Sequence, residues 1–287
     1  MTWLLLLLVT LFRPHAGLPA ADTEASGPGG VSIPLNPPGE DELGRLPPVT
    51  RARGANPPLV VIDPGHGGRD PGASSAVSAA PEKEITLALA RAIRDDLARS
   101  GRVRVALTRD DDSYLLLQDR YEIARRLGAD LFISIHADAA PLNDQAHGAT
   151  IYTLSEVASD REAAQLAQRE NETDLIAGTR LSPDPSVNLI LIDLAQRESM
   201  NVSAEFARLI HREAAPLFPF RPDWHRFAAF VVLKAPDIPS VLFESGYLTN
   251  QVDADFISSP QGRRQIADGM RRAIEAHFAR RLLPQQS

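Results

Sequence analysis

The chain of 287 residues contains no cysteine, and this absence excludes three kinds of chemistry. A protein without thiols has no cysteine nucleophile, no thiolate metal site and no disulfide framework. Any metal ion bound by this protein must therefore be held by histidine and carboxylate side chains.

The sequence also lacks a surplus of positive charge. Its 30 Lys and Arg residues are outnumbered by 37 Asp and Glu residues, which gives a formal net charge of −7. Proteins that bind the phosphate backbone of nucleic acids carry a basic surplus or a basic stripe. We therefore expect no nucleic-acid partner.

No hydrophobic run is long enough to cross a bilayer, which requires about 20 apolar residues. The longest run is Trp3–Phe12, and small residues follow it at Ala16, Ala20 and Ala21. A short apolar run before small residues is typical of a secretory signal peptide. We expect a signal peptide over residues 1–21, cut near residue 20 or 21, and an exported protein with no membrane span after its removal. An uncleaved anchor or a buried strand is the alternative.

Residues 22–58 are rich in Pro, Gly, Asp and Glu and show no apolar periodicity. Such a composition cannot bury enough apolar surface to fold, so it predicts a disordered linker. The folded catalytic domain is expected to run from residue 59 to residue 283.

Short β-branched or aromatic runs alternate with helical patterns in this domain. Several of the expected strands are apolar on both faces. The six expected strands are Leu59–Asp63, Val103–Thr108, Leu131–Ile135, Ala149–Leu154, Ala228–Leu233 and Ser240–Phe243. The segments Glu82–Ala98 and Gln261–Phe278 have the apolar stripe of amphipathic helices. This alternation predicts a single α/β domain with a mostly apolar central mixed sheet covered by helices on both faces.

The region from about residue 156 to residue 216 breaks the alternation. It contains two helical stretches, Asp160–Ile176 and about Leu189–Ala215, separated by the turn-rich residues 182–185. We expect an inserted helical arm here.

Polar side chains follow three of the expected strands at their carboxyl ends. His66, His136 and Glu244 each come directly after such a strand, or within a few residues of its end. Ligands of open α/β sheets bind at that edge. Glu82 begins an amphipathic helix and can face the same edge.

Two histidines and one carboxylate form the ligand set of a catalytic zinc site, which keeps a coordination position open. His66, His136 and Glu82 are the candidate ligands, and Glu244 is the candidate proton shuttle. Each of these residues has a simpler explanation when it is taken alone. A histidine at a strand end is commonly a hydrogen-bonded loop residue, and a glutamate in the first turn of a helix is favoured by the helix dipole.

Two other readings of this region are disfavoured. The Gly-rich turn at residues 65–72 matches neither the dinucleotide fingerprint nor the P-loop. Ser245 is preceded by Phe243-Glu244, so it is not the centre of a G-x-S-x-G nucleophile elbow.

Four separated motifs together resemble the zinc-dependent N-acetylmuramoyl-L-alanine amidases of the cell wall. They are VIDPGHGGRDPGA at 61–73, EKEITLALA at 82–90, ADLFISIHADA at 129–139 and FVVLKAPDIPSVLFESGYLTN at 230–250. The resemblance implies that His66, Glu82 and His136 bind zinc and that Glu244 is the catalytic glutamate. It further implies hydrolysis of the amide between N-acetylmuramic acid and the L-alanine of the peptidoglycan stem peptide.

The expected arm resembles that of the subgroup which splits septal peptidoglycan in Gram-negative bacteria. This resemblance implies a periplasmic enzyme of cell separation and wall turnover. It also implies an arm helix that blocks the zinc with a glutamate until an activator protein displaces it. Glu170 is the candidate for this glutamate, with Glu162 and Glu172 as alternatives.

Two further functions remain open from the sequence. One is a different zinc amidohydrolase of the cell wall, such as a carboxypeptidase or a sugar deacetylase, which would use the same metal chemistry on another bond. The other is a catalytically inactive wall-binding module, which the complete set of four site residues disfavours.

Overall fold

The computed structural model describes residues 45–78, 80–140, 143, 145–176 and 189–281. The expected signal peptide, and the expected linker up to residue 44, lie outside the described residues. Within the rest of the expected linker, the backbone N–H of Thr50 donates to the carbonyl of Val105 at 2.8 Å, and the hydroxyl of Thr50 accepts from the N–H of Val105 at 2.8 Å. Contacts with the sheet therefore begin before residue 59.

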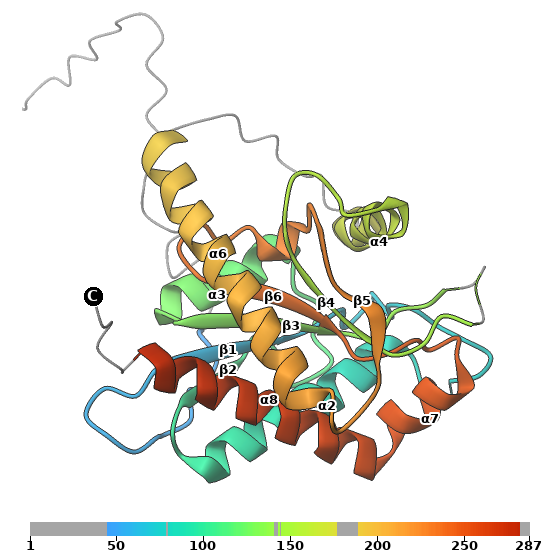
Figure 1. Ribbon diagram of the computed structural model, residues 1–287, viewed down its shortest axis with the longest axis horizontal. Coiled ribbons are helices and arrows are strands. Elements are labelled where there is room, and N and C mark those ends of the chain that lie inside the picture. Colours follow the sequence, from blue (N-terminus) through green and yellow to red (C-terminus); the bar gives the residue numbers. More distant parts are fainter. Residues whose placement is uncertain (1–44, 79, 141–142, 144, 177–188, 282–287) are drawn as a thin grey trace, which may run out of the picture. The chain divides into compact units, whose positions relative to one another are not determined.

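A six-stranded sheet lies at the centre of the domain, in the order β2-β1-β3-β6-β4-β5 (Figure 1). Its strands are β1 (Leu59–Pro64), β2 (Arg104–Leu107), β3 (Leu131–His136), β4 (Ala149–Leu154), β5 (Phe220–Ala228) and β6 (Ser240–Glu244). The first four in sheet order are parallel, β4 runs antiparallel to β6, and β5 pairs in parallel with β4. The sheet is therefore mixed, as predicted.

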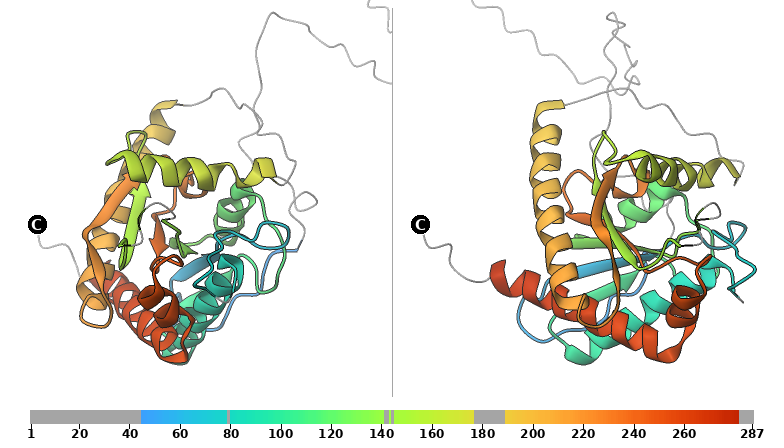
Figure 2. Two further views of the ribbon diagram at one scale, coloured as in Figure 1. Left: turned by 90° about the vertical axis from the view of Figure 1, so that its right-hand side faces the viewer. Right: turned by 45° about the vertical axis from the view of Figure 1, so that its right-hand side comes forward.

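Alternating side chains of the strands feed two hydrophobic cores, one on each face. On β1, Val60 and Ile62 belong to one core, and Leu59 and Val61 belong to the other. The first core is closed by α2 (Glu82–Ser100), α6 (Leu189–Ala214), α7 (Gln251–Ser258) and α8 (Pro260–Arg281). The second is closed by α3 (Leu117–Leu127), α4 (Arg161–Asn171) and the short 3-10 turn η1 (Val231–Leu233). Figure 2 shows these two layers on either side of the strands, and the predicted α/β class is confirmed.

The ends of α2 follow from its sequence. The helix begins directly after Pro81, which cannot donate a backbone hydrogen bond, so Glu82 lies in its first turn. The helix ends at Gly101, whose φ of 65° lies in the left-handed region that glycine adopts without penalty. Its buried stripe fixes the rotation of the helix and thereby directs Glu82 to the carboxyl edge of the sheet.

The prediction of a strand over residues 228–233 is wrong. The structure places β5 at Phe220–Ala228, and Val231–Leu233 form the turn η1. β5 is an edge strand, so it tolerates a proline and many polar side chains. Its sequence therefore lacks the apolar pattern by which a buried strand is predicted. The helices α3 and α7 were also not predicted.

The expected arm divides into two parts. The second half of α6 is built into the core, where Phe206, Ile210 and Ala214 are fully buried in the cluster that also contains α8 residues. α4 and the short α5 (Thr173–Ile176) belong instead to the opposite face, where Ala163 and Leu166 pack into the second core. The arm is therefore not one unit: α6 and the α4–α5 segment (residues 161–176) pack on opposite faces of the sheet.

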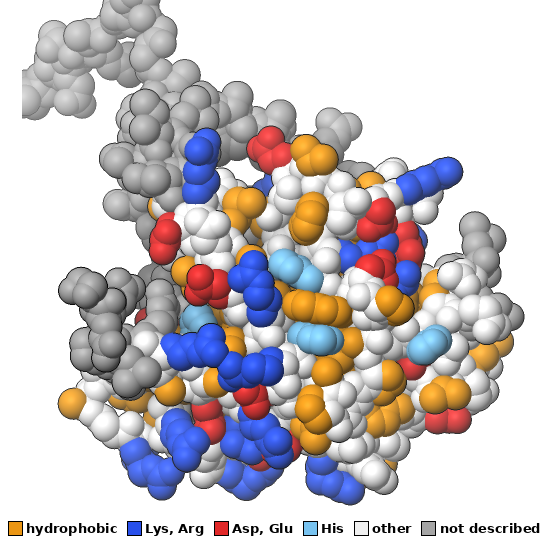
Figure 3. Space-filling view, in the orientation of Figure 1, with side chains coloured by type: hydrophobic (Ala, Val, Ile, Leu, Met, Phe, Trp, Pro, Cys, Tyr) orange, Lys and Arg blue, Asp and Glu red, His pale blue; other side chains and the backbone are white. Residues whose placement is uncertain are grey.

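Charged side chains on the face shown in Figure 3 are mixed in sign, with many Lys and Arg side chains in its lower part, where α2 and α8 lie. Ion pairs of α8 include Arg271 with Asp96 of α2 at 2.9 Å and Arg272 with Asp268 at 2.7 Å. None of the helices in the described part of the chain combines the length and the apolar character that a bilayer span requires.

Candidate active site

The turn that follows β1 is held by two buried arginines. Arg120 donates to the carbonyl oxygens of Pro64 and His66, each at 2.9 Å. Arg109 donates to the carbonyl oxygen of Gly65 at 2.7 Å. These bonds stabilise a backbone in which His66 has a φ of 62°, a left-handed conformation that is uncommon for a residue other than glycine. Such conformations persist where the surroundings fix them, often at functional sites.

Asp63 anchors this arrangement from inside the sheet. Its carboxylate accepts hydrogen bonds from Thr108 at 2.6 Å and Ser134 at 2.8 Å, and it pairs with Arg120 at 2.9 Å. Burial opposes ionisation of this carboxyl group, but the charge of Arg120 and the two hydroxyl donors lower the pKa of Asp63 below its ordinary value. Asp63 is therefore a buried anion that orients Arg120.

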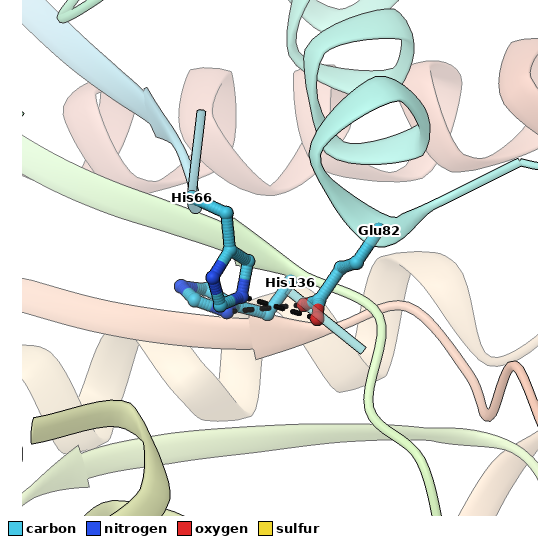
Figure 4. Close-up of side chains that lie close together, drawn as sticks. All are labelled: His66, Glu82 and His136. Carbon is cyan, nitrogen blue, oxygen red and sulfur yellow. Dashed lines mark ion pairs between the residues drawn. The ribbon is translucent and has the colours of Figure 1, made fainter. Parts of the chain in front are cut away.

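Three of the predicted site residues meet at one point at the carboxyl edge of the sheet (Figure 4). His66 extends from the turn after β1, Glu82 from the first turn of α2, and His136 from the last residue of β3. His66 Nε2 lies 3.1 Å from one oxygen of Glu82, and His136 Nδ1 lies 3.2 Å from the other. All three side chains are buried.

Neighbouring groups orient two of these side chains, His66 and Glu82. His66 Nδ1 lies 2.8 Å from Asp70 Oδ2, which leaves Nε2 to face Glu82. Glu82 accepts from the backbone N–H of Ala73 at 2.7 Å and of Ala137 at 2.9 Å, one bond to each oxygen. Asp70, four residues after His66 in the chain, therefore sets the orientation of this ring.

The facing ring nitrogens have the properties of metal ligands. Among the described residues, neither His66 Nε2 nor His136 Nδ1 has a hydrogen-bond partner, although both atoms are buried. Tetrahedral zinc with bonds of about 2.0–2.2 Å separates its ligand atoms by about 3.4 Å. The observed separations of 3.1 and 3.2 Å are close to this value, so the residues fit a bound divalent cation.

The electrostatics of the site also favour a cation. Burial disfavours a charged imidazole, but the carboxylates of Glu82, Glu170 and Asp70 outweigh it and raise the pKa of His66 well above its ordinary value. Burial likewise opposes ionisation of Glu82, and the two histidines lower its pKa. The pocket therefore stabilises positive charge at the ring of His66.

Glu244 lies directly beside this group. It is the last residue of β6 and stands opposite His136 in the register of the two strands. Both of its carboxylate oxygens are buried without a hydrogen-bond partner in the described part of the structure. Burial and the nearby charges of Asp138 and Glu82 raise the pKa of Glu244 well above its ordinary value.

Of the three arm glutamates considered from the sequence, Glu170 is the one that reaches this site. Its Oε2 atom lies 3.6 Å from His66 Nε2 and 3.4 Å from His136 Nδ1. Glu162 pairs instead with Arg221 at 2.7 Å, and the exposed Glu172 accepts from Gln168.

One ion pair at the site was not anticipated from the sequence. Arg169 of α4 lies 2.9 Å from Asp138, two residues after His136. Burial raises the pKa of Asp138 to about 7, and the charges of Glu82 and Glu170 add to this effect while Arg169 opposes it. The sequence shows that Asp138 lies two residues after His136. Its partner Arg169 is 31 residues further along the chain, and no local sequence pattern predicts a pairing over that separation.

A layered α/β domain that gathers two imidazoles and a carboxylate at one point, with another buried carboxylate beside them, has the donor set of a mononuclear metallohydrolase. Comparison with known proteins identifies the family. The model of the Amidase_3 family, described as N-acetylmuramoyl-L-alanine amidase, matches residues 60–276. The chain therefore belongs to this family.

Individual relatives agree with this assignment. The chain is 37% identical over 237 residues to the N-acetylmuramoyl-L-alanine amidase AmiA of Salmonella typhimurium, covering 82% of this chain and 81% of the relative. It is also 37% identical over 222 residues to AmiA of Escherichia coli, covering 77% and 76% of the two chains. Among solved structures, the catalytic domain of the amidase CwlV from Bacillus (Paenibacillus) polymyxa superposes with a TM-score of 0.58 at 25% identity, covering 77% of this chain and 98% of that domain.

Proposed function

We propose that this protein is an exported, zinc-dependent peptidoglycan hydrolase that cleaves the amide bond between N-acetylmuramic acid and the L-alanine of the stem peptide. The observation that carries the proposal is the convergence of His66, Glu82 and His136 next to Glu244, in a chain of the amidase family. Zinc is the proposed cation because two histidines, one carboxylate and an open position are typical of catalytic zinc sites.

The reaction requires an activated water and a protonated leaving group. A divalent cation held by the two histidines and Glu82 would supply Lewis acidity that polarises the scissile carbonyl and acidifies the attacking water. Glu244 accepts the proton of that water and delivers it to the amine nitrogen of the departing peptide. Its lack of protein hydrogen-bond partners within the described residues leaves both oxygens available for this transfer.

The residues around the site keep these groups in position. Asp70 holds His66 with Nε2 as the free nitrogen, and the backbone N–H groups of Ala73 and Ala137 fix the two oxygens of Glu82. The ligand atoms are therefore pre-organised before substrate binds, which lowers the entropic cost of reaching the reactive geometry.

The test of this function is the digestion of purified sacculi with the full chain, followed by mass spectrometry of the soluble products. We expect free peptides with an N-terminal L-alanine and glycan strands that have lost them. A zinc chelator should stop the release, and added Zn²⁺ should restore it. Release of a C-terminal amino acid or of acetate instead would identify another zinc amidohydrolase, and an absence of any product from both this chain and its Glu170→Ala variant would contradict an enzymatic function.

The α4–α5 segment is proposed to inhibit this activity. The position of Glu170 Oε2, within 3.6 Å of both facing ring nitrogens, supports a role in which this carboxylate occupies the position needed by substrate. We propose that an activator protein displaces the segment in the periplasm, which couples hydrolysis to cell separation and wall turnover.

This role predicts the effect of Glu170→Ala. Loss of a charge-assisted contact of about 1.5–3 kcal/mol should raise the basal activity of the purified chain roughly tenfold or more. Release of soluble peptide from dye-labelled sacculi measures the effect. Glu172→Ala is the matched control, because Glu172 lies two residues away and its side chain bonds to exposed Gln168. An unchanged rate in a folded Glu170→Ala variant would contradict inhibition by this residue.

A further inference from the structure

Two arginines of β5 lie beneath the N-terminal end of α4. The side chain of Arg226 is only 2% exposed, and its Nε atom donates to Asp160, the residue that caps α4, at 3.0 Å. Arg221 donates from Nη1 to Glu162 in the first turn of α4 at 2.7 Å. Two cations of the sheet are thus paired with two carboxylates at the N-terminal end of α4.

The arginines belong to the rigid part of the domain. Arg226 donates to the hydroxyl of Tyr152 at 3.1 Å, and Arg221 donates to the hydroxyl of Tyr247 at 2.5 Å. Tyr152 and Tyr247 are fully buried or nearly so, and Tyr247 follows Glu244 by three residues. The two arginines therefore form a fixed site that is continuous with the proposed catalytic centre.

Displacement of α4 would leave this site short of negative charge. Asp223 stays on β5, 3.1 Å from Arg221 and 3.5 Å from Arg226, so one carboxylate would remain for two guanidinium groups. Two guanidinium groups held close together with one carboxylate between them attract a further anion. The open form of the enzyme therefore presents an anion-binding site at this position.

We infer that Arg221 and Arg226 bind a carboxylate of the peptide portion of the substrate, and that Asp160 and Glu162 occupy its place in the inhibited form. The inference rests on the proposed function. The N-acetylated sugars next to the scissile amide offer neutral amides and hydroxyls, whereas the peptide on the other side carries free carboxylates. A pair of arginines matches the geometry and charge of carboxylates.

The spacing along α4 agrees with this assignment. Glu162 and Glu170 are eight residues apart in the helix, a rise of about 12 Å. An extended peptide covers this length with about three or four residues at about 3.3–3.6 Å each. A short peptide whose first amide lies at the metal site can therefore place a carboxylate at the arginines.

The test compares two substitutions that remove the same ion pair. Glu162→Gln and Arg221→Gln are each made in the full chain carrying Glu170→Ala, so that the site is open in both. A muramoyl-peptide with free peptide carboxylates is compared with the same compound in which these are carboxamides. In the Glu162→Gln form we expect KM for the carboxylate substrate to be about tenfold lower than for the carboxamide, with similar kcat. In the Arg221→Gln form, where Asp223 neutralises the remaining Arg226, the two KM values should be nearly equal.

A purely structural ion pair predicts the same behaviour from both variants, so an equal preference for the carboxylate substrate in the Arg221→Gln form would overturn the inference. Calorimetric titration of the released peptide, as carboxylate and as carboxamide, measures the same discrimination without turnover. If neither compound is hydrolysed by the Glu162→Gln form, the proposed function fails, and the titration still decides whether Arg221 binds a carboxylate.

Discussion

Glu244→Gln is expected to lower the rate of amide hydrolysis by a factor on the order of 10²–10⁴. Glutamine has nearly the same shape as glutamate, but its amide cannot accept the proton of the attacking water. Because Glu244 has no hydrogen-bond partner in the described residues, the substitution breaks no ion pair. Hydrolysis of sacculi, followed under zinc-saturating conditions, measures the loss.

The same substitution should leave the fold intact or make it more stable. Burial and neighbouring carboxylates raise the pKa of Glu244, so its charged form is unfavourable in the folded protein, and a neutral side chain removes that cost. Thermal denaturation of both proteins tests this expectation. Glu205→Gln on the exposed side of α6 is the control for activity. Full activity of the Glu244→Gln variant would contradict the role of Glu244 as the proton carrier.

His136→Ala is expected to abolish both metal binding and hydrolysis. The substitution leaves one histidine and one carboxylate at the site, and catalytic zinc sites require three protein ligands. The substitution also removes a ring that is only 5% exposed and lies 4.8 Å from the ring of His66, measured between centroids. It therefore leaves an empty volume beside His66. Elemental analysis after dialysis measures the bound zinc, and the assay on sacculi measures activity.

The control for this variant is His147→Ala, which removes an exposed histidine 11 residues further along the chain. We expect that protein to retain its metal and its activity. Circular dichroism separates loss of the ligand from loss of the fold. A His136→Ala protein that keeps one equivalent of zinc and hydrolyses sacculi would exclude His136 as a ligand.

The sequence predicted the central strands and the meeting of the four candidate site residues at one edge of the sheet because both depend on local patterns. Buried parallel strands are continuous apolar runs, and the functional residue directly follows the run in the case of His136 and Glu244. Glu82 was placed at the start of its helix by the apolar stripe of that helix. Topology then brings these local features to one edge of the sheet.

The parts that could not be predicted depend on contacts between distant residues. Arg120 holds the turn of His66 from α3, a helix that the sequence did not reveal. Asp138 and Arg169 form their ion pair only because α4 packs over the site. The edge strand β5 lacks the apolar pattern of a buried strand, so the sequence did not predict it. The ion pairs of its arginines with the acidic end of α4 join residues that are distant in the chain.

The arm expected at about residues 156–216 also depends on contacts that the sequence does not show. Its two helical stretches were both expected, but the sequence did not show that α6, with Phe206 and Ile210 fully buried, and the α4–α5 segment pack on opposite faces of the sheet. Both have amphipathic patterns, and only the partner of each apolar face distinguishes them. Point substitutions such as Glu170→Ala therefore test inhibition better than deletion of residues 156–216, which would remove part of the core.

The most direct test of the account is anomalous X-ray diffraction from crystals of the zinc-loaded protein, recorded on both sides of the zinc absorption edge. The account predicts a single strong peak within about 2.0–2.2 Å of His66 Nε2, His136 Nδ1 and a carboxylate oxygen of Glu82. A peak at other residues, or no peak at these three in an active protein, would contradict it.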